Sequence, residues 1–391
     1  MNKIFRAAKE IFIGAPTAFD LPKPLIGRDR VERKYSVQRK ILDTILKNKR
    51  ISFEKYMSMA LYSRNHGDYD AGYYTSGEAL IGEACHFNTF PQSNSPVFGQ
   101  GIAKQLNSMW EALGCPKVFH AIEMGAGNGI MARDILRYVN KEMPDFYKAL
   151  KYVIIEISNP LIQRQKNSID PMLRASVEWK NASAIKYKFK HKITGCFLSN
   201  ELVDNLPVHE LFGYKNEAYE TYITYNGFTI EKEPVKLSSR KVIDMLKTRF
   251  STFPVPEKIP FYVSTASIDW LKNLADNLKR GYILTIDYGT SDMTKYFYEH
   301  DTLRTYSRLV TPSHKNDPLY YIGKADITAD VDFGSLVIYG RKFGLRKVGY
   351  FNQDYYFSQI LSTPLIKSEM ESGPYGMRVL IQAKKARLKL G

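Results

Sequence analysis

The chain has 391 residues, of which 44% are hydrophobic, and this composition excludes a disordered or low-complexity protein. Its formal net charge of +16 favours contact with nucleic acid, anionic lipid or an acidic protein, although a lysine-rich solvated surface would carry the same charge. The three cysteines form no CxxC pair and the seven histidines lack metal-ligand spacing, so we expect a reducing compartment and no metal.

The first third of the chain is expected to be helical. Apolar residues recur at helical spacing over Arg28–Lys47, Phe53–Tyr62 and Val97–Leu113. Residues 62–96 are rich in Gly, Tyr, Ser and Asn, which predicts a long irregular loop of the kind that serves an active site. Residues 1–114 should therefore form an N-terminal helical region that carries this loop.

Beyond this region, short apolar runs alternate with helical segments. The expected strands are Val118–Glu123, Tyr152–Glu156, Ser176–Trp179, Thr194–Ser199 and Tyr282–Asp287. This alternation predicts an α/β fold, a Rossmann-like parallel sheet with helices on both faces.

The alternation of strands and helices stops after residue 207. A hairpin-like stretch at Tyr219–Thr229 and a helix near Lys241–Phe250 indicate an inserted subdomain on the substrate side. We therefore divide the rest of the chain into a cofactor-binding half at 115–207, the insertion at 208–270, and the remaining sheet with C-terminal elements at 271–391.

A glycine-rich turn joins the first of these strands to a helix. It lacks the third glycine of the dinucleotide pattern GxGxxG, because Ile130 stands at that position. The ExGxGxG form that remains is typical of sites for a nucleoside bearing an amino acid, whose carboxylate faces the backbone amides at the helix start. The expected ligand contacts are Gly125, Ala126, Gly127 and Gly129, with Glu123 ordering the loop or meeting the ammonium group of the ligand.

The next strand ends in Glu156, where a carboxylate can accept hydrogen bonds from both ribose hydroxyls. We assign Glu156 and the adjoining Ile157 to the same ligand. Asn181 and Ala182 follow the short strand after it and should lie beside the adenine, although Asn181 is also a common turn residue. A glycine turn alone also occurs for tight packing, so the acid strengthens the interpretation.

Polar residues also follow the strand Thr194–Ser199, namely Asn200, Glu201 and Asp204. Function in open parallel sheets gathers at the carboxyl ends of strands, so these residues should rim the crevice of the glycine turn, with Asn200 beside the cofactor. A spacing of three predicts that Glu201 and Asp204 share one side of a helical turn, where two carboxylates can grip a cationic acceptor and orient or deprotonate its nitrogen. The alternative is that the acids cap a helix or offset nearby lysines.

In their order, these residues resemble the MidA-like family of class I methyltransferases. The resemblance implies S-adenosylmethionine as cofactor and a protein arginine as acceptor, as for mitochondrial members of the family. It places Thr89 and Pro91 with the glycine turn and Glu156 at the cofactor, and Glu201 and Asp204 at the acceptor as catalytic residues. The matching segments include Ile51–Phe53, Ser95–Gly99, Asn200–His209, Ile286–Gly289 and Asp326–Ala329.

Other functions remain open from the sequence. A small-molecule N- or O-methyltransferase is the nearest alternative. A non-catalytic RNA-binding or assembly protein on the same fold is another, because Tyr187, Phe189 and His191 alternate with four lysines; an edge strand protected by lysines has the same pattern and is favoured. We thus expect a protein or small-molecule acceptor rather than nucleic acid, no membrane span, and the cytoplasm, with the mitochondrial matrix as alternative.

Overall fold

The structure is a computed structural model that describes residues 37–64, 71–77, 79, 89–250, 256–292, 302–307, 317–361 and 376–388. It divides into two compact units, each assembled from distant segments. The first unit contains residues 1–80, 205–266 and 292–329, and the second contains 81–204, 267–291 and 330–391. The division into four successive segments stays a prediction, and the expected helical residues before Val37 lie outside the described part.

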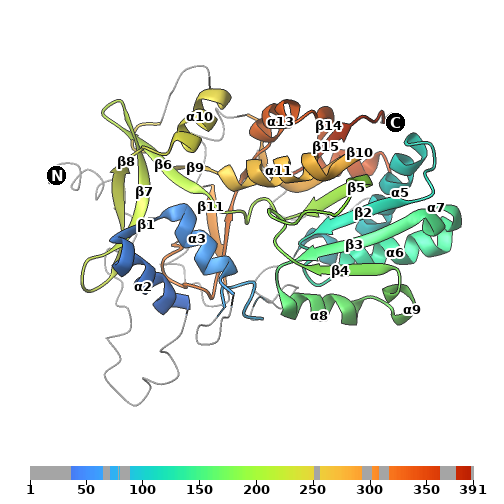
Figure 1. Ribbon diagram of the computed structural model, residues 1–391, viewed down its shortest axis with the longest axis horizontal. Coiled ribbons are helices and arrows are strands. Elements are labelled where there is room, and N and C mark those ends of the chain that lie inside the picture. Colours follow the sequence, from blue (N-terminus) through green and yellow to red (C-terminus); the bar gives the residue numbers. More distant parts are fainter. Residues whose placement is uncertain are drawn as a thin grey trace, which may run out of the picture. The chain divides into compact units, whose positions relative to one another are not determined.

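The second unit is built on a mostly parallel sheet of eight strands (Figure 1). Its central strands run parallel, as the alternating pattern predicts. Strand β15 runs antiparallel to its neighbours β10 and β14, and neither β14 nor β15 was among the expected strands. The order is β14 (Arg346–Asn352), β15 (Met377–Lys384), β10 (Leu278–Thr290), β5 (Ile193–Asn200), β2 (Phe119–Met124), β3 (Leu150–Glu156) and β4 (Val177–Asn181), with β13 (Val331–Asp332) paired to β10.

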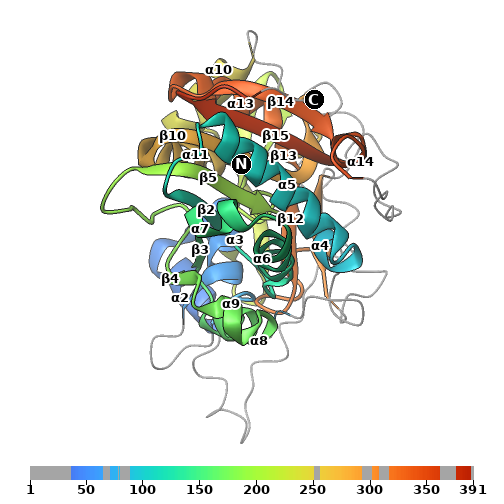
Figure 2. The same ribbon diagram turned by 90° about the vertical axis from the view of Figure 1, so that its right-hand side faces the viewer.

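Helices cover both faces of this sheet, which confirms the expected α/β architecture. Figure 2 shows α5 and α6 on one side and α11 on the other. Alternate strand residues such as Ala121 and Cys196 belong to the core cluster of α5 and α6, while Trp270 of α11 contacts the Met124 sulfur. The helices are α4 (Phe90–Ser93), α5 (Val97–Ala112), α6 (Ile130–Glu142), α7 (Pro144–Ala149), α8 (Asn159–Ser168), α9 (Pro171–Arg174), α11 (Thr265–Asn277), α13 (Phe333–Lys342) and α14 (Gln353–Ser358).

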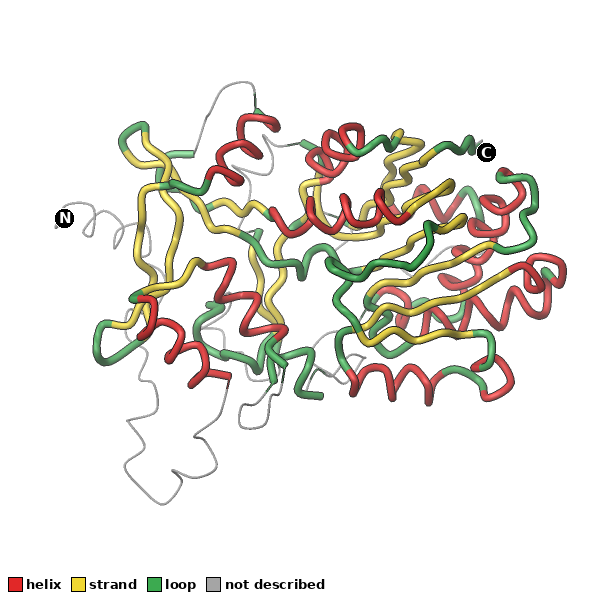
Figure 3. The backbone as a smooth tube through the Cα atoms, viewed as in Figure 1, coloured by secondary structure: helices red, strands yellow, loops and turns green. Residues whose placement is uncertain are grey.

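The first unit contains an antiparallel sheet and several helices (Figure 3). The expected hairpin is present as β7 and β8, and its turn is held by Asn226, whose side-chain oxygen accepts the N–H groups of Phe228 and Thr229. The strands are β1 (Arg50–Ser52), β6 (His209–Tyr214), β7 (Glu217–Tyr225), β8 (Ile230–Lys236), β9 (Phe261–Val263), β11 (Leu303–Tyr306) and β12 (Asp326–Ala329), and the helices are α2 (Val37–Asn48), α3 (Phe53–Tyr62) and α10 (Arg240–Arg249).

One local expectation is wrong. Residues 183–192 form turns and irregular backbone and not an edge strand, so the alternating lysines do not protect a strand edge. The segment 62–96 is irregular or turn over most of its described residues, as expected, and contains the short helix α4; its residues 65–70, 78 and 80–88 lie outside the described part. Among the helices that the structure describes, none combines the length and apolarity needed to cross a membrane.

Candidate cofactor and active site

The glycine turn between β2 and α6 depends on left-handed backbone. Gly125, Gly127 and Gly129 have φ angles of 68°, 52° and 80°, a region that other residues rarely adopt. The Gly125 N–H extends the ladder to the Ile155 carbonyl, and the Gly129 N–H closes the turn on Ala126. Because Gly129 is also the N-cap of α6 and has no side chain, the helix starts without a side-chain cap, which suits an anionic group of a ligand.

Helix α8 packs against this turn and supports it, a role of the helix that the sequence analysis missed. Ser158 caps the helix, and Gln165 lies fully buried on the same side as Leu161 and Ile162. The Gln165 Nε2 donates to the Gly127 carbonyl at 3.0 Å and to Glu156 Oε2 at 3.1 Å, so one side chain joins the turn to the ribose candidate. A glutamine on the apolar side of a helix is the signal that the sequence offered.

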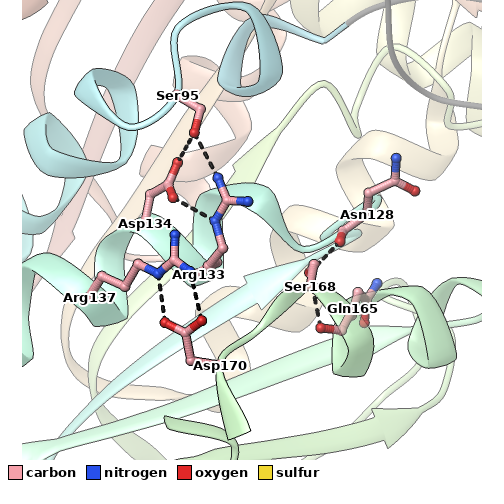
Figure 4. Close-up of polar contacts among 8 residues, drawn as sticks. All are labelled: Ser95, Asn128, Arg133, Asp134, Arg137, Gln165, Ser168 and Asp170. Carbon is pink, nitrogen blue, oxygen red and sulfur yellow. Dashed lines mark hydrogen bonds and ion pairs between the residues drawn. The ribbon is translucent and has the colours of Figure 1, made fainter. Parts of the chain in front are cut away.

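A second residue of α8 fixes the far end of the turn. The Ser168 hydroxyl donates to the Asn128 carbonyl at 2.7 Å, as Figure 4 shows. A Cβ atom on Gly129 would lie 2.9 Å from the Gln165 Cα and 2.9 Å from the Ser168 oxygen. Glycine at 129 therefore permits close packing of the turn on α8.

Glu156 lies at the end of β3 with both carboxylate oxygens engaged. Oε1 accepts the Ser158 N–H at 3.0 Å and Oε2 accepts from Gln165, yet burial raises the pKa of Glu156 to about 7. At the same corner, the Asn181 amide donates to the carbonyls of Glu156 and Ile157, and the Ala182 N–H donates to that of Glu156. The structure thus brings together the four residues expected around the nucleoside.

We predict that binding of S-adenosylhomocysteine depends on pH through Glu156. Ribose hydroxyls would donate to the ionised carboxylate, so binding should favour the deprotonated form. Affinity should then rise as pH increases through about 7 and become constant above it, with a Kd about tenfold weaker at pH 6 than at pH 8. Glu156→Gln should bind more weakly at the higher pH, by about 1.5–3 kcal/mol, and lose this pH step. Calorimetric titration measures both, and an unchanged step in the variant would assign it to another acid.

Glu123 is buried at the end of β2 and faces the core. The Tyr152 hydroxyl donates to Glu123 Oε2 at 2.6 Å, whereas burial first, and the neighbouring Glu156 second, raise the pKa of Glu123 to about 7. This contact supports the first of the two expected roles, ordering of the loop, over contact with a ligand ammonium.

Glu123 should also make stability depend on pH. The pKa of Glu123 in the folded state lies above the ordinary value of 4.5. Its contribution to the stability of the fold is therefore complete below pH 4.5 and is lost as pH rises through about 7. The unsubstituted protein should therefore lose this stability between about pH 5 and pH 8, whereas Glu123→Gln should not. The difference between the melting temperature of the variant and that of the unsubstituted protein should increase by several degrees over this range. S-adenosylhomocysteine affinity should stay within a few-fold. A large loss of affinity would instead place Glu123 at the ligand.

The segment after β5 is a turn and not the helical turn that the acid spacing suggested. Glu201 is left-handed, with φ 48°, and residues 202–204 direct their N–H groups to one carboxylate. This carboxylate is Asp287, three residues before the end of β10, whose Oδ2 accepts from Leu202, Val203 and Asp204 at 3.2, 2.8 and 3.3 Å. Sequence reasoning assigned Asp287 no role; its signal was an acid at the end of the neighbouring parallel strand.

The Asp287 carboxylate is fully buried beside a second acid. Burial first, and then the charge of Glu201, raise the pKa of Asp287 to about 7, although backbone N–H groups lower it. Asp204, also buried, follows in the same turn. The carboxyl groups of Glu201 and Asp287 therefore interact near the ends of β5 and β10, and the sequence analysis had proposed only the first of them for this site.

Glu201 joins this turn to the Thr89–Pro91 segment. Its Oε1 accepts the N–H of Phe90, the first residue of α4, at 3.0 Å, and the Asn200 amide at 3.0 Å. Thr89 is the N-cap of α4 but makes no side-chain cap, so Glu201 supplies one from a distant part of the chain. We call residues 201–204 the acidic turn. A Cβ on Gly125 would lie 2.8 Å from Leu202 Cδ1, which places the glycine turn directly against this acidic turn.

Ion pairs hold the surrounding elements in place. Arg133 of α6 donates to Asp134 at 2.8 Å and to the Ser95 hydroxyl at 2.7 Å, and Ser95 donates to Asp134 at 2.5 Å (Figure 4). Arg137 binds Asp170 through two hydrogen bonds of 2.6 Å. These contacts attach α6 to the segment after α4 and to the start of α9.

The residues present fit a cofactor that has hydrogen-bond donors. Asn200 Oδ1 and Gln165 Oε1 are buried acceptors without a hydrogen-bond partner among the described residues, one beside each half of the site. An ammonium group or ribose hydroxyls would satisfy such acceptors. Within the same described residues, no group of three or more His, Cys, Asp or Glu is placed to hold a metal ion.

A Rossmann-like sheet with this glycine turn and an acid at the next strand end defines a nucleoside-binding α/β protein of the methyltransferase type. Residues 101–351 match the family described as "Putative S-adenosyl-L-methionine-dependent methyltransferase". The chain belongs to this family, whose cofactor is S-adenosylmethionine.

Individual relatives agree with this assignment. The chain is 30% identical over 284 residues to the Drosophila melanogaster "Protein arginine methyltransferase NDUFAF7 homolog, mitochondrial", and 27% identical over 288 residues to the Homo sapiens protein. These matches cover 67% and 68% of this chain and 61% of each relative. A crystal structure from Burkholderia thailandensis, bound to S-adenosyl-homocysteine, has the same fold, with a TM-score of 0.74, 21% identity, and coverage of 94% of this chain and 96% of that one.

Proposed function

We propose that this protein transfers a methyl group from S-adenosylmethionine to a guanidinium nitrogen of an arginine in another protein. The observation that carries the proposal is the contact between the two halves of the site. The glycine turn lies directly against the acidic turn, so a methyl donor on one would face carboxylates on the other. The names of the relatives, which are arginine methyltransferases, support the choice of acceptor.

Each group of residues has a proposed part. The glycine turn, with Ala126, binds the methionine moiety; Glu156 with Ile157 binds the ribose; and Asn181 with Ala182 borders the adenine. Asn200, Thr89 and Pro91 complete the cofactor site, the first through its buried Oδ1 and the others through α4, which Glu201 caps. Glu123 orders the turn from the core.

Glu201 and Asp204 act on the acceptor. Bound S-adenosylmethionine supplies a methyl group on a positively charged sulfur, which needs only an in-line nitrogen with a lone pair. A guanidinium offers five N–H donors in a planar fork, so two carboxylates can hold it in one orientation and accept the proton that the methylated nitrogen releases. Asp287 positions the turn that carries both acids.

The relatives also support a compartment. Their names place them in mitochondria, which favours the matrix, the alternative expectation, and offers no support for the cytoplasm. We therefore propose a matrix protein as the acceptor.

The direct test is transfer of label to protein. Purified full-length chain is incubated with methyl-labelled S-adenosylmethionine and a mitochondrial matrix extract, and the labelled proteins are hydrolysed to amino acids. We expect label in methylarginine. Label only in small molecules would overturn the choice of acceptor, whereas S-adenosylhomocysteine binding without any transfer would overturn the enzymatic function.

A further inference from the structure

A second charged feature lies at the opposite end of the sheet from the glycine turn. The parallel strands β2, β3, β5 and β10 all start at this edge, and β14 also starts and β15 ends there (Figure 1). The register places five residues in one row across the sheet, namely Lys151, His120, Gly195, Gly281 and Lys384. Residues in or next to this row mark one continuous edge of the second unit.

This edge is strongly basic. We define the basic rim as Lys151, Lys192, Lys279, Arg280, Arg346 and Lys385, all of which are exposed. Among the described residues, none of these six side chains forms an ion pair. Two acids near the rim are already engaged, because Glu178 pairs with Lys180 and Asp276 with Lys272.

One further lysine, Lys384, lies among the charges of the rim. Burial first, and then the neighbouring Lys192 and Lys385, lower the pKa of Lys384, whose amine donates to the Ala275 carbonyl. A folded protein gains no internal stability from such an arrangement. The excess positive charge is therefore available to an external anion.

The loop before β5 adds more lysines and is anchored by aromatic residues. Phe189 packs at 4.9 Å from Tyr187 and 6.1 Å from Phe197 of β5, and its N–H donates to Asn277. Lys186, Lys188 and Lys190 between and beside these rings are exposed. Tyr187 and Phe189 are part-buried and pack against each other, and Phe189 also packs against β5, so these rings anchor the loop to the sheet.

We propose that the basic rim binds the anionic surface of a phospholipid membrane. The rim spans six strands, from β3 to β14, which at a spacing of ~4.8 Å is roughly 24 Å. A charged headgroup layer is wide enough to contact all of it together. Lysines dominate the rim and its loop, and they act as hydrated point charges suited to lipid phosphates. The glycine turn lies at the other end of the strands, so membrane contact leaves the cofactor site unobstructed.

Vesicle co-sedimentation of the full chain tests the proposal. We expect binding to vesicles of phosphatidylcholine mixed with phosphatidylglycerol, no binding to phosphatidylcholine alone, and release at high salt. The triple substitution Lys151→Glu, Lys192→Glu and Lys279→Glu should weaken partitioning by about 100-fold or more. Affinity for S-adenosylhomocysteine should not change, so the result is independent of the proposed methyl transfer.

A matched control changes the same charge elsewhere. Lys47, Lys55 and Lys247 are exposed and lie outside the rim, and their joint replacement by Glu should reduce vesicle binding far less. Equal losses in both triple variants would show that only net charge matters and would overturn the rim. Failure of the unsubstituted chain to bind anionic vesicles, or binding of an RNA homopolymer in their place, would overturn the choice of membrane.

Discussion

The Glu201→Gln protein is expected to bind S-adenosylhomocysteine within a few-fold of the unsubstituted protein but to transfer methyl groups about 100-fold more slowly or worse. The structure makes this substitution selective. The Gln oxygen can still accept from Phe90 and Asn200, so the cap of α4 should survive while the negative charge is lost. Positioning and proton acceptance act mainly on the transition state, so turnover should fall without a matching loss of cofactor affinity.

Glu201→Ala provides the comparison. It removes charge and cap together, and loss of the cap should cost about 0.5–2 kcal/mol of stability. Asp204→Asn should resemble Glu201→Gln, and the double variant should be little worse than either if the acids act as a unit. Melting temperature, cofactor affinity and label transfer are measured for each. A stable Glu201→Gln protein with full transfer activity would refute the catalytic assignment and reduce Glu201 to a structural cap.

Gly127→Val is expected to abolish measurable S-adenosylhomocysteine binding, a loss of about 100-fold or more, because three effects act together. Gly127 has φ 52°, which a β-branched residue adopts only with strain. The substituted backbone would shift the carbonyl that Gln165 holds at 3.0 Å. The valine side chain would also occupy the turn where the methionine moiety is proposed to lie. Calorimetric titration with S-adenosylhomocysteine measures the loss.

Gly114→Val is the matched control for this experiment. Gly114 is also left-handed, with φ 79°, but it lies outside the site and a Cβ there would meet nothing within 4 Å. Both variants should lose roughly 1–2 kcal/mol of stability to backbone strain, but only Gly127→Val should lose the ligand. Unchanged affinity in a folded Gly127→Val protein would move the cofactor away from the glycine turn.

The sequence alone was sufficient to predict the elements that depend on residues close together along the chain. The apolar runs at 152–156 and 194–199 are strands, and helix α3 covers the expected Phe53–Tyr62. The glycine turn and the position of Glu156 at a strand end could also be predicted from the sequence. Strand, turn and helix are consecutive there, and glycine indicates a left-handed backbone locally. Family membership followed from the order of such motifs along the chain.

Contacts between distant residues decided the rest. Spacing alone put Glu201 and Asp204 on a helical turn, but Asp287, from a strand more than eighty residues later, draws three N–H groups into a different turn. Glu201 likewise caps α4 across 111 residues. Gln165 and Asp287 drew no assigned role because a buried polar side chain is recognised only by the partner that satisfies it. Such partners come together only when the sheet assembles, so the geometry of the acidic turn belongs to the tertiary structure alone.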